Sequence, residues 1–219
     1  MAHRKWIVGV AMIALSVTSI AFAAEKGRRP KAGAEFDILG ASRDAVWVNA
    51  ERSMVTEPFT GVQYRVTGRS VDGPDTMWMV ERSTRPYGAQ TFKPTGTMTW
   101  FNGPSGVGLF ERRAREYAVK APYMVGTSWM GPRWDAPGML SGVVGDCRYT
   151  ITQDMPMYWE GQRYEGAVVH ESGKGVERDH WWLEGLGHVL VISSRGDTLL
   201  IRTHETMGKA QPIGTPGRY

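Results

Sequence analysis

Alternation of apolar and polar residues with a period of two is the dominant pattern over much of this chain. Val62, Tyr64 and Val66 fall on one side of an extended segment, and polar residues fall on the other. This period is typical of a half-buried β-strand, because successive side chains of a strand point to opposite faces. The sequence DGPD at 72–75 predicts a turn, and residues 77–82 predict the partner strand of a hairpin.

Further strands are predicted toward the C-terminus, between turns rich in glycine. A strand at 97–101 ends at the Asn-Gly-Pro of 102–104. After Arg148, the predicted strands have a spacing that suits an antiparallel meander. They lie at 149–152, 162–170, 180–183, 188–193 and 198–203.

The sequence of three segments is compatible with more than one local structure. Apolar residues in 107–120 recur at helical spacing, which favours a helix, although a long strand also fits the neighbouring pattern. Residues 36–39 are a short strand or the approach to a helical turn at 42–47. Residues 121–145, rich in proline and glycine, are predicted to be irregular. They either line a ligand pocket or form a surface connection whose tryptophans cover the edge of the core.

Together these patterns predict a mainly β protein. Its fold is a curved antiparallel sheet, a half-barrel meander, with one or two short helices. The expected organisation is a signal peptide at 1–23, a flexible leader at 24–35, a single β-rich domain at 36–206 and a disordered tail at 207–219.

The N-terminus has the layout of a secretory signal peptide. Arg4 and Lys5 precede an apolar run from Trp6 to Ile20, and Ala-Phe-Ala at 21–23 supplies the small residues of a cleavage site. An uncleaved anchor is the alternative, but the run of about 15 residues is shorter than the roughly 20 that a spanning helix needs. We therefore expect Sec-type cleavage near Ala23 and a periplasmic or secreted protein that does not span the membrane.

Composition narrows the possible partners. The formal net charge is +4, and basic residues are interspersed with acids rather than clustered, so nucleic-acid binding is not expected. Cys147 is the only cysteine, so an internal disulfide is impossible. A small buried residue is expected at this position, although a reactive thiol or an intermolecular bridge would also fit.

Tryptophans are the candidate ligand-binding residues of the predicted domain. A concave sheet face covered with aromatic and methionine side chains suits apolar ligands, although the same residues also pack ordinary cores. Strand alternation allows only some of them to share one face. The candidates are Trp78, Trp100, Trp129, Trp134, Trp159, Trp181 and Trp182, with methionines such as Met79 and Met98 beside them.

Histidines and acids could form a site only across strands. His170, His180, His188 and His204 contain no pair at the i, i+2 spacing that places two ligands on one face of a strand. No motif of a nucleophilic elbow or of a helical zinc site occurs in the sequence. No catalytic residue, metal or cofactor is therefore predicted, and a secreted hydrolase with a cross-strand His/acid site remains an alternative.

The meander at 161–205 resembles the end of exported half-barrel envelope proteins of the lipoprotein-carrier type. The resemblance rests on QRYEGAVVH at 162–170 and DHWWLEGLGHV at 179–189. It departs from the family pattern at Leu183-Glu184, where Ala-Pro is frequent, and at His188. It implies a strongly curved antiparallel sheet around a helical plug, open on one side to apolar ligands.

The resulting functional hypothesis is an exported, non-enzymatic envelope protein that binds a lipid or acyl chain on a concave aromatic face. Its expected partners are a lipid or lipoprotein ligand and an envelope partner protein. An interaction module for a partner protein or a polysaccharide is an alternative, because exposed tryptophans can dock proteins and stack on sugars.

Overall fold

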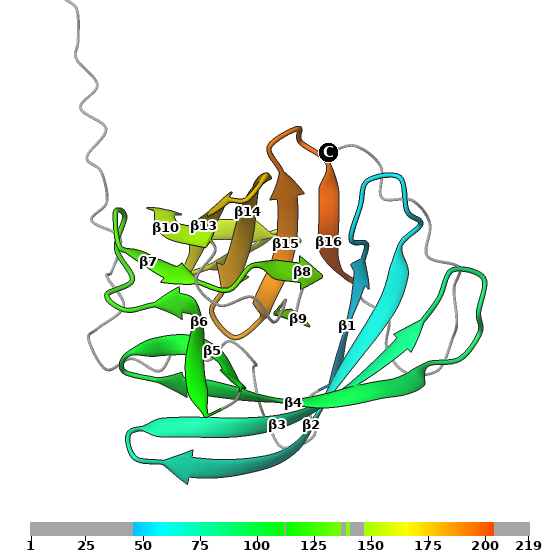
Figure 1. Cartoon of the computed structure of the whole chain (residues 1–219), viewed down its shortest axis with the longest axis horizontal. Helices are drawn as coiled ribbons and strands as arrows, with labels where there is room; N and C mark the ends of the chain where they lie inside the picture. Colours follow the sequence, from blue (N-terminus) through cyan, green and yellow to red (C-terminus); the bar gives the residue numbers. More distant parts are fainter. Residues whose placement is uncertain (1–45, 112, 137–138, 141–146, 204–219) are drawn as a thin grey trace, which may run out of the picture.

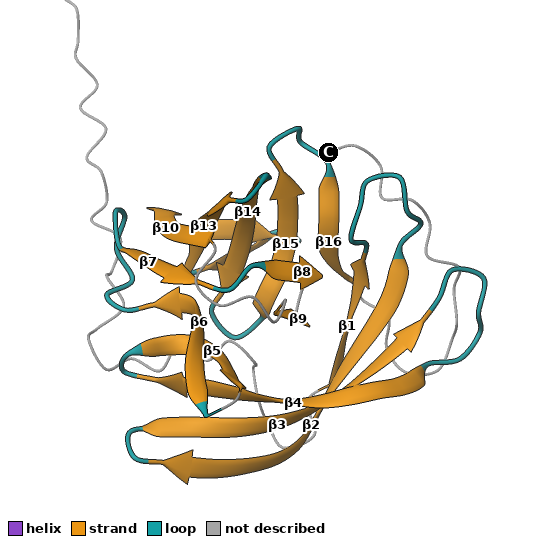
Figure 2. Ribbon diagram, viewed as in Figure 1, coloured by secondary structure: helices purple, strands orange, loops and turns teal. Residues whose placement is uncertain are grey.

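The computed structural model describes residues 46–111, 113–136, 139–140 and 147–203. Every regular element in these ranges is a β-strand (Figure 2). The expected signal peptide, leader and tail lie outside the described residues. No helix in the described ranges is long and apolar enough to cross a membrane.

The strands follow one another with short connections. They are β1 (Val46–Glu51), β2 (Thr60–Asp72), β3 (Asp75–Arg85), β4 (Lys93–Gly103), β5 (Gly106–Glu111), β6 (Ala114–Lys120), β7 (Ser128–Gly131), β8 (Trp134–Ala136), β9 (Met139–Leu140), β10 (Cys147–Gln153), β11 (Met157–Trp159), β12 (Gln162–Tyr164), β13 (Gly166–Gly173), β14 (Val176–Leu183), β15 (Gly187–Ser193) and β16 (Thr198–Thr203).

Twelve of these strands form one antiparallel sheet, in the order β6-β5-β4-β3-β2-β1-β16-β15-β14-β13-β10-β7. The sheet curves until it is nearly closed, with β8 on its concave side (Figure 1). The indole Nε1 of Trp129 on β7 donates a hydrogen bond of 3.1 Å to the carbonyl of Tyr117 on β6, linking the two end strands. The predicted curved antiparallel sheet is therefore confirmed.

Cross-strand register determines which residues share the concave face. Residues directly opposite one another in an antiparallel pair point to the same side of the sheet. Tyr64 stands opposite Arg82, and Trp78 stands opposite Trp100. On the other half of the sheet, Val169 stands opposite His180. Tyr64, Trp78, Trp100 and Val169 belong to the main buried cluster, which spans β2–β8, β10, β13 and β14. Arg82 and His180 lie two positions along their strands from cluster residues and so share the same face.

The helix favoured for 107–120 is wrong. The segment forms β5 and β6, joined by a tight turn in which Arg113 has φ of 66°. Gly108 lies so close to the backbone of Glu116 that an added Cβ would clash with its carbonyl oxygen. Helical spacing in the sequence was overridden by pairing with β4, which buries Val107 and Leu109 by strand alternation.

Two other expectations change. Residues 46 and 47 belong to β1 rather than to a helical turn, and residues 42–45 lie outside the described ranges. The segment 121–145 is not wholly irregular, because it contains β7, β8 and β9. The short helices expected from the sequence do not occur within the described residues.

Candidate functional site

Five of the seven candidate tryptophans meet in one buried cluster on the concave side of the sheet. Their side chains are only 1–7% exposed. They come from both halves of the curved sheet and from β8, so the fold brings together residues that are distant in sequence. These five residues are Trp78, Trp100, Trp129, Trp134 and Trp182.

Trp134 stands at the centre of this cluster. Its ring centroid lies 6.1 Å from that of Trp100 and 6.3 Å from that of Trp182. The imidazole of His188 lies 6.2 Å away and also stacks on Trp182, with 4.2 Å between centroids. The described residues contain no helical plug of the kind that the half-barrel resemblance implied, and Trp134 on strand β8 packs against the tryptophans of the concave face instead.

The other two candidate tryptophans lie elsewhere. Trp159 and Trp181 are partly buried and pack against a second cluster that contains Met157, Val168 and Val189. Trp181 alternates with Trp182 along β14 and so points to the opposite face. Neither side chain belongs to the interior cluster around Trp134.

Three polar contacts hold the Trp134 segment in place. The backbone N–H of Trp134 donates to Glu171 Oε1 at 3.2 Å, and the Arg178 guanidinium donates to the Trp134 carbonyl. The Tyr149 hydroxyl donates to the carbonyl of Pro132 at 2.5 Å. The segment is thus anchored by side chains of β10, β13 and β14 rather than by pairing with the main sheet.

Glu171 connects these anchors to two histidines. The carboxylate accepts from Arg178 Nε at 2.5 Å and from His180 Nε2 at 2.8 Å. Its Oε1 also lies 3.0 Å from the Tyr149 hydroxyl oxygen, whose single proton is shared between this carboxylate and the Pro132 carbonyl. His180 Nδ1 lies 3.2 Å from His188 Nε2. Because His180 donates through Nε2 to a carboxylate, the neutral ring accepts through Nδ1 and His188 donates.

Burial and hydrogen bonding set the charges in this network. Burial alone would raise the pKa of Glu171, but hydrogen bonds and charges from His180 and Arg178 outweigh it and hold the pKa below its usual range. Burial lowers the pKa of His180 and, more strongly, that of His188. The network therefore contains an ionised Glu171–Arg178 pair and two neutral imidazoles.

The described residues place no side-chain nucleophile beside the cross-strand histidine–acid cluster. In the part of the chain that the structure describes, no serine, threonine or cysteine side chain is hydrogen-bonded to His180 or His188. His170 lies apart from the cluster and pairs with Asp179 at 2.8 Å, while His204 lies outside the described residues. Among the described residues, no group of three or more His, Cys, Asp or Glu side chains is placed to hold a metal ion.

Cys147 is a free, fully buried residue, which confirms the expectation of a small core side chain. Burial, followed by the charge of Glu171, raises the pKa of its thiol to about 11. A thiol of this pKa is almost wholly protonated at neutral pH and is a poor nucleophile.

A second polar cluster lies on the concave face of β1–β3. Glu51 is 3% exposed, and its Oε1 accepts from the Tyr64 hydroxyl at 2.8 Å and from Asn49 Nδ2 at 3.3 Å. Its Oε2 has no hydrogen bond and lies 3.8 Å from a guanidinium nitrogen of Arg82. Burial raises the pKa of Glu51 to about 7, against the opposing effects of Tyr64, Arg82 and Asn49.

Four half-buried apolar side chains pack against the tryptophan cluster. Trp47, Met98, Tyr117 and Tyr123 pack against the buried core while remaining partly accessible. Trp47 stacks on Tyr64 with 5.3 Å between ring centroids. Trp47 and Met98, which we call the apolar rim, lie on the concave face, whereas Tyr117 packs on Phe101, which alternates with Trp100 along β4.

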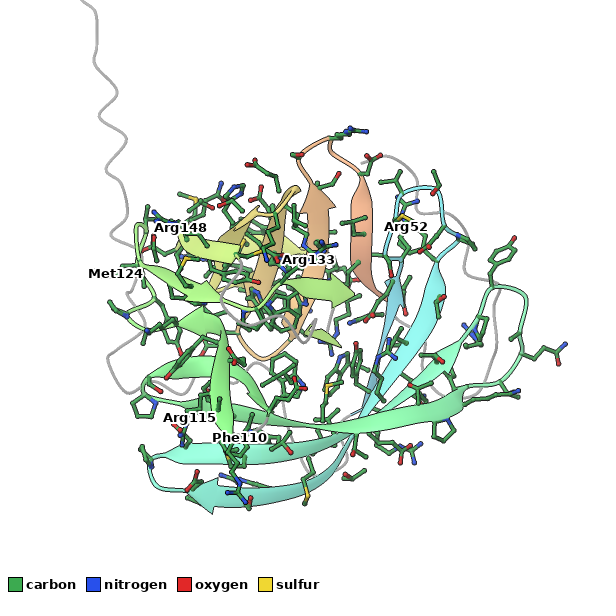
Figure 3. The ribbon with its side chains drawn as sticks, in the orientation of Figure 1. Arg52, Phe110, Arg115, Met124, Arg133 and Arg148 are labelled. Atoms are coloured by element: carbon green, nitrogen blue, oxygen red, sulfur yellow. The ribbon has the colours of Figure 1, made fainter. Side chains whose placement is uncertain are left out.

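Arg115, which lies outside these clusters, links strands at one end of the sheet. Figure 3 shows Arg115 beside Phe110 at the β5–β6 end of the sheet, and the guanidinium lies 5.9 Å from the ring centroid. Arg115 also pairs with the buried Asp75 at 2.7 Å and with Asp72 at 3.2 Å. These contacts tie β6 to the β2–β3 hairpin.

Sequence reasoning did not identify Glu51 or Glu171 as site residues. Glu171 follows Ala167 and Val169 at alternate positions of a strand, so its place on an apolar face was readable from the sequence. Glu51 similarly follows Asn49 on β1. A glutamate on the buried face of a predicted strand is the signal that would have identified Glu51 and Glu171.

Comparisons with known proteins find two solved structures of low similarity. No family model and no curated protein matches the chain. A candidate lipoprotein from Parabacteroides distasonis has 9% identity and a TM-score of 0.39, covering 75% of this chain and 96% of its own. A candidate exported protein with a YmcC-like fold, from Bacteroides fragilis, has 7% identity and a TM-score of 0.37. The match covers 73% of this chain and 93% of that protein.

Proposed function

We propose that this protein is exported and binds the apolar part of a lipid or acyl chain on the concave face of its sheet, without covalent chemistry. The signal-peptide pattern before Ala23 supports export. The observation that carries the binding proposal is the apolar rim, because it exposes aromatic and methionine surface continuous with the tryptophan core.

Aromatic and thioether side chains suit such a ligand for physical reasons. Methionine adapts its shape to irregular apolar groups, and aromatic rings offer large apolar surfaces without ordering many torsions. Each square ångström of apolar surface removed from water contributes roughly 25 cal/mol to binding. Met98 is fixed beside the core by the Trp100 indole, whose Nε1 lies 3.1 Å from the Met98 sulfur.

The two alternative functions have less support. A hydrolase would need a nucleophile or an activated water beside His188, and the described residues place no side-chain nucleophile there. An interaction module would present exposed tryptophans, yet every tryptophan in the described ranges is at least half-buried.

Native mass spectrometry of the mature protein, purified from its export route, tests the proposal. We expect a discrete additional mass of a few hundred daltons that organic extraction removes and added 1-monolauroylglycerol restores at one molecule per chain. An unliganded mass that does not change when 1-monolauroylglycerol is added would overturn the proposal.

A further inference from the structure

Three buried polar atoms of the Glu51 cluster have no hydrogen-bond partner among the described residues. They are Glu51 Oε2, Asn49 Oδ1 and Arg82 Nε. All three belong to side chains that already contact one another through Glu51. Burying such groups without partners is costly, so their retention calls for an explanation beyond folding stability.

Free space lies over Gly96, the exposed residue of β4 that stands opposite Arg82. Gly96 on β4 stands directly opposite Arg82, so its missing side chain would point to the face that Tyr64 and Arg82 occupy. A Cβ built on Gly96 meets no atom within 4 Å. The backbone of Gly96 is not in the left-handed region, so the glycine is not required by its conformation.

The polar cluster also adjoins the apolar rim. The Tyr64 ring stacks on Trp47 of the rim, while its hydroxyl bonds to Glu51. Met98, another rim residue, stands two positions from Gly96 on β4 and shares its face. A ligand lying on the rim would therefore place one of its ends near Gly96, Arg82 and Glu51.

We propose that the Glu51 cluster is the head-group site for the ligand, and that it selects a neutral head bearing hydroxyl groups, as in a monoacylglycerol. This inference rests on the proposed function. Hydroxyls can donate to Glu51 Oε2 and Asn49 Oδ1 and accept from Arg82 Nε, whereas methyl esters donate nothing.

Charge explains why the preferred head is neutral. The Glu51 carboxyl and the Arg82 guanidinium lie 3.8 Å apart, with side chains only 4% and 13% exposed. Introducing an additional charge into so little water is unfavourable unless a matching opposite charge is free. A hydroxylated head satisfies the unbonded atoms and leaves the charge balance of the pair unchanged.

Binding of two matched probes tests the inference. Isothermal titration would compare 1-monolauroylglycerol with methyl laurate, which has the same acyl chain and no hydroxyl, below the concentrations at which either aggregates. We expect wild-type protein to bind the glyceride at least tenfold more tightly. Glu51→Gln should remove most of this preference, because its amide nitrogen replaces an acceptor with a donor.

Two controls separate the head-group site from general effects. Glu81→Gln changes the same charge on the opposite face of β3 and should leave the preference intact. Gly96→Leu should fill the open space and weaken glyceride binding, whereas Thr97→Leu on the other face of β4 should not.

The possible failures are distinguishable. Equal binding of both probes by wild-type protein, or a preference unchanged in Glu51→Gln, overturns the head-group site while the apolar-ligand function stands. Absence of binding by either probe contradicts the proposed function, and the head-group inference with it.

Discussion

Replacing Glu51 by glutamine is expected to stabilise the protein at neutral and alkaline pH. Burial raises the pKa of this carboxyl from 4.5 to about 7. The folded protein therefore holds the proton more tightly than the unfolded chain, and the stability that it supplies is complete below pH 4.5 and lost as the pH rises through 7. The difference between the two pKa values corresponds to about 3 kcal/mol of unfolding free energy.

Urea unfolding of wild type and Glu51→Gln at pH 5 and pH 8 measures this effect. Buried His180 and His188 act in the opposite direction, because their lowered pKa values make stability fall as the pH drops below 6.5. Both proteins contain these histidines, so the difference between them isolates Glu51. We expect the variant to gain about 2.5 kcal/mol over wild type between pH 5 and pH 8.

Glu81→Gln serves as the matched control, since Glu81 lies on the opposite face of β3 and should show no such gain. The reasoning is refuted if Glu51→Gln is no more stable than wild type at pH 8. A stability difference that is the same at both pH values would also refute it.

Three other predictions concern the interior and the N-terminus. Glu171→Gln should lower the unfolding free energy by about 3 kcal/mol or more, because it leaves Arg178 buried without its counter-ion. Glu177 is exposed on the same hairpin, so Glu177→Gln should change the unfolding free energy by less than about 0.5 kcal/mol. Equal losses in the two variants would contradict a stabilising role of the buried Glu171–Arg178 pair. Cys147 should react with a thiol reagent only after denaturation, since burial holds its pKa at about 11; rapid labelling of the folded protein would show that the thiol is accessible. Mass spectrometry of the exported protein should find an N-terminus directly after Ala23, and retention of the leader would contradict signal cleavage.

Strand formation was predictable because strand alternation is local. The pattern at Val62, Tyr64 and Val66 gave the correct face, and the turn at 72–75 gave the correct hairpin register, with Asp72 opposite Asp75. The segment 107–120 was not predictable in the same way. Its residues have good helix propensity, and only pairing with β4, which is a tertiary contact, decides for strands.

The candidate site was only partly predictable. Tryptophan content indicated an aromatic interior, but the convergence of Trp100, Trp134 and Trp182 depends on the curvature of the sheet. The pairing of Glu171 with His180 depends on cross-strand register, which a single sequence does not specify. The polar residue at an interior strand position was visible, whereas its partners were not.

Quenching of tryptophan fluorescence by a brominated acyl chain tests the central claim most directly. Bromine quenches indoles in near contact, so the monoglyceride of 12-bromododecanoic acid should reduce the emission of the folded protein in a saturable manner. Met98→Glu, which places a charge in the apolar rim, should abolish quenching, whereas Met79→Glu on the exposed outer face should not. Absence of saturable quenching in wild type, or equal quenching in both variants, would contradict an apolar ligand on the concave face.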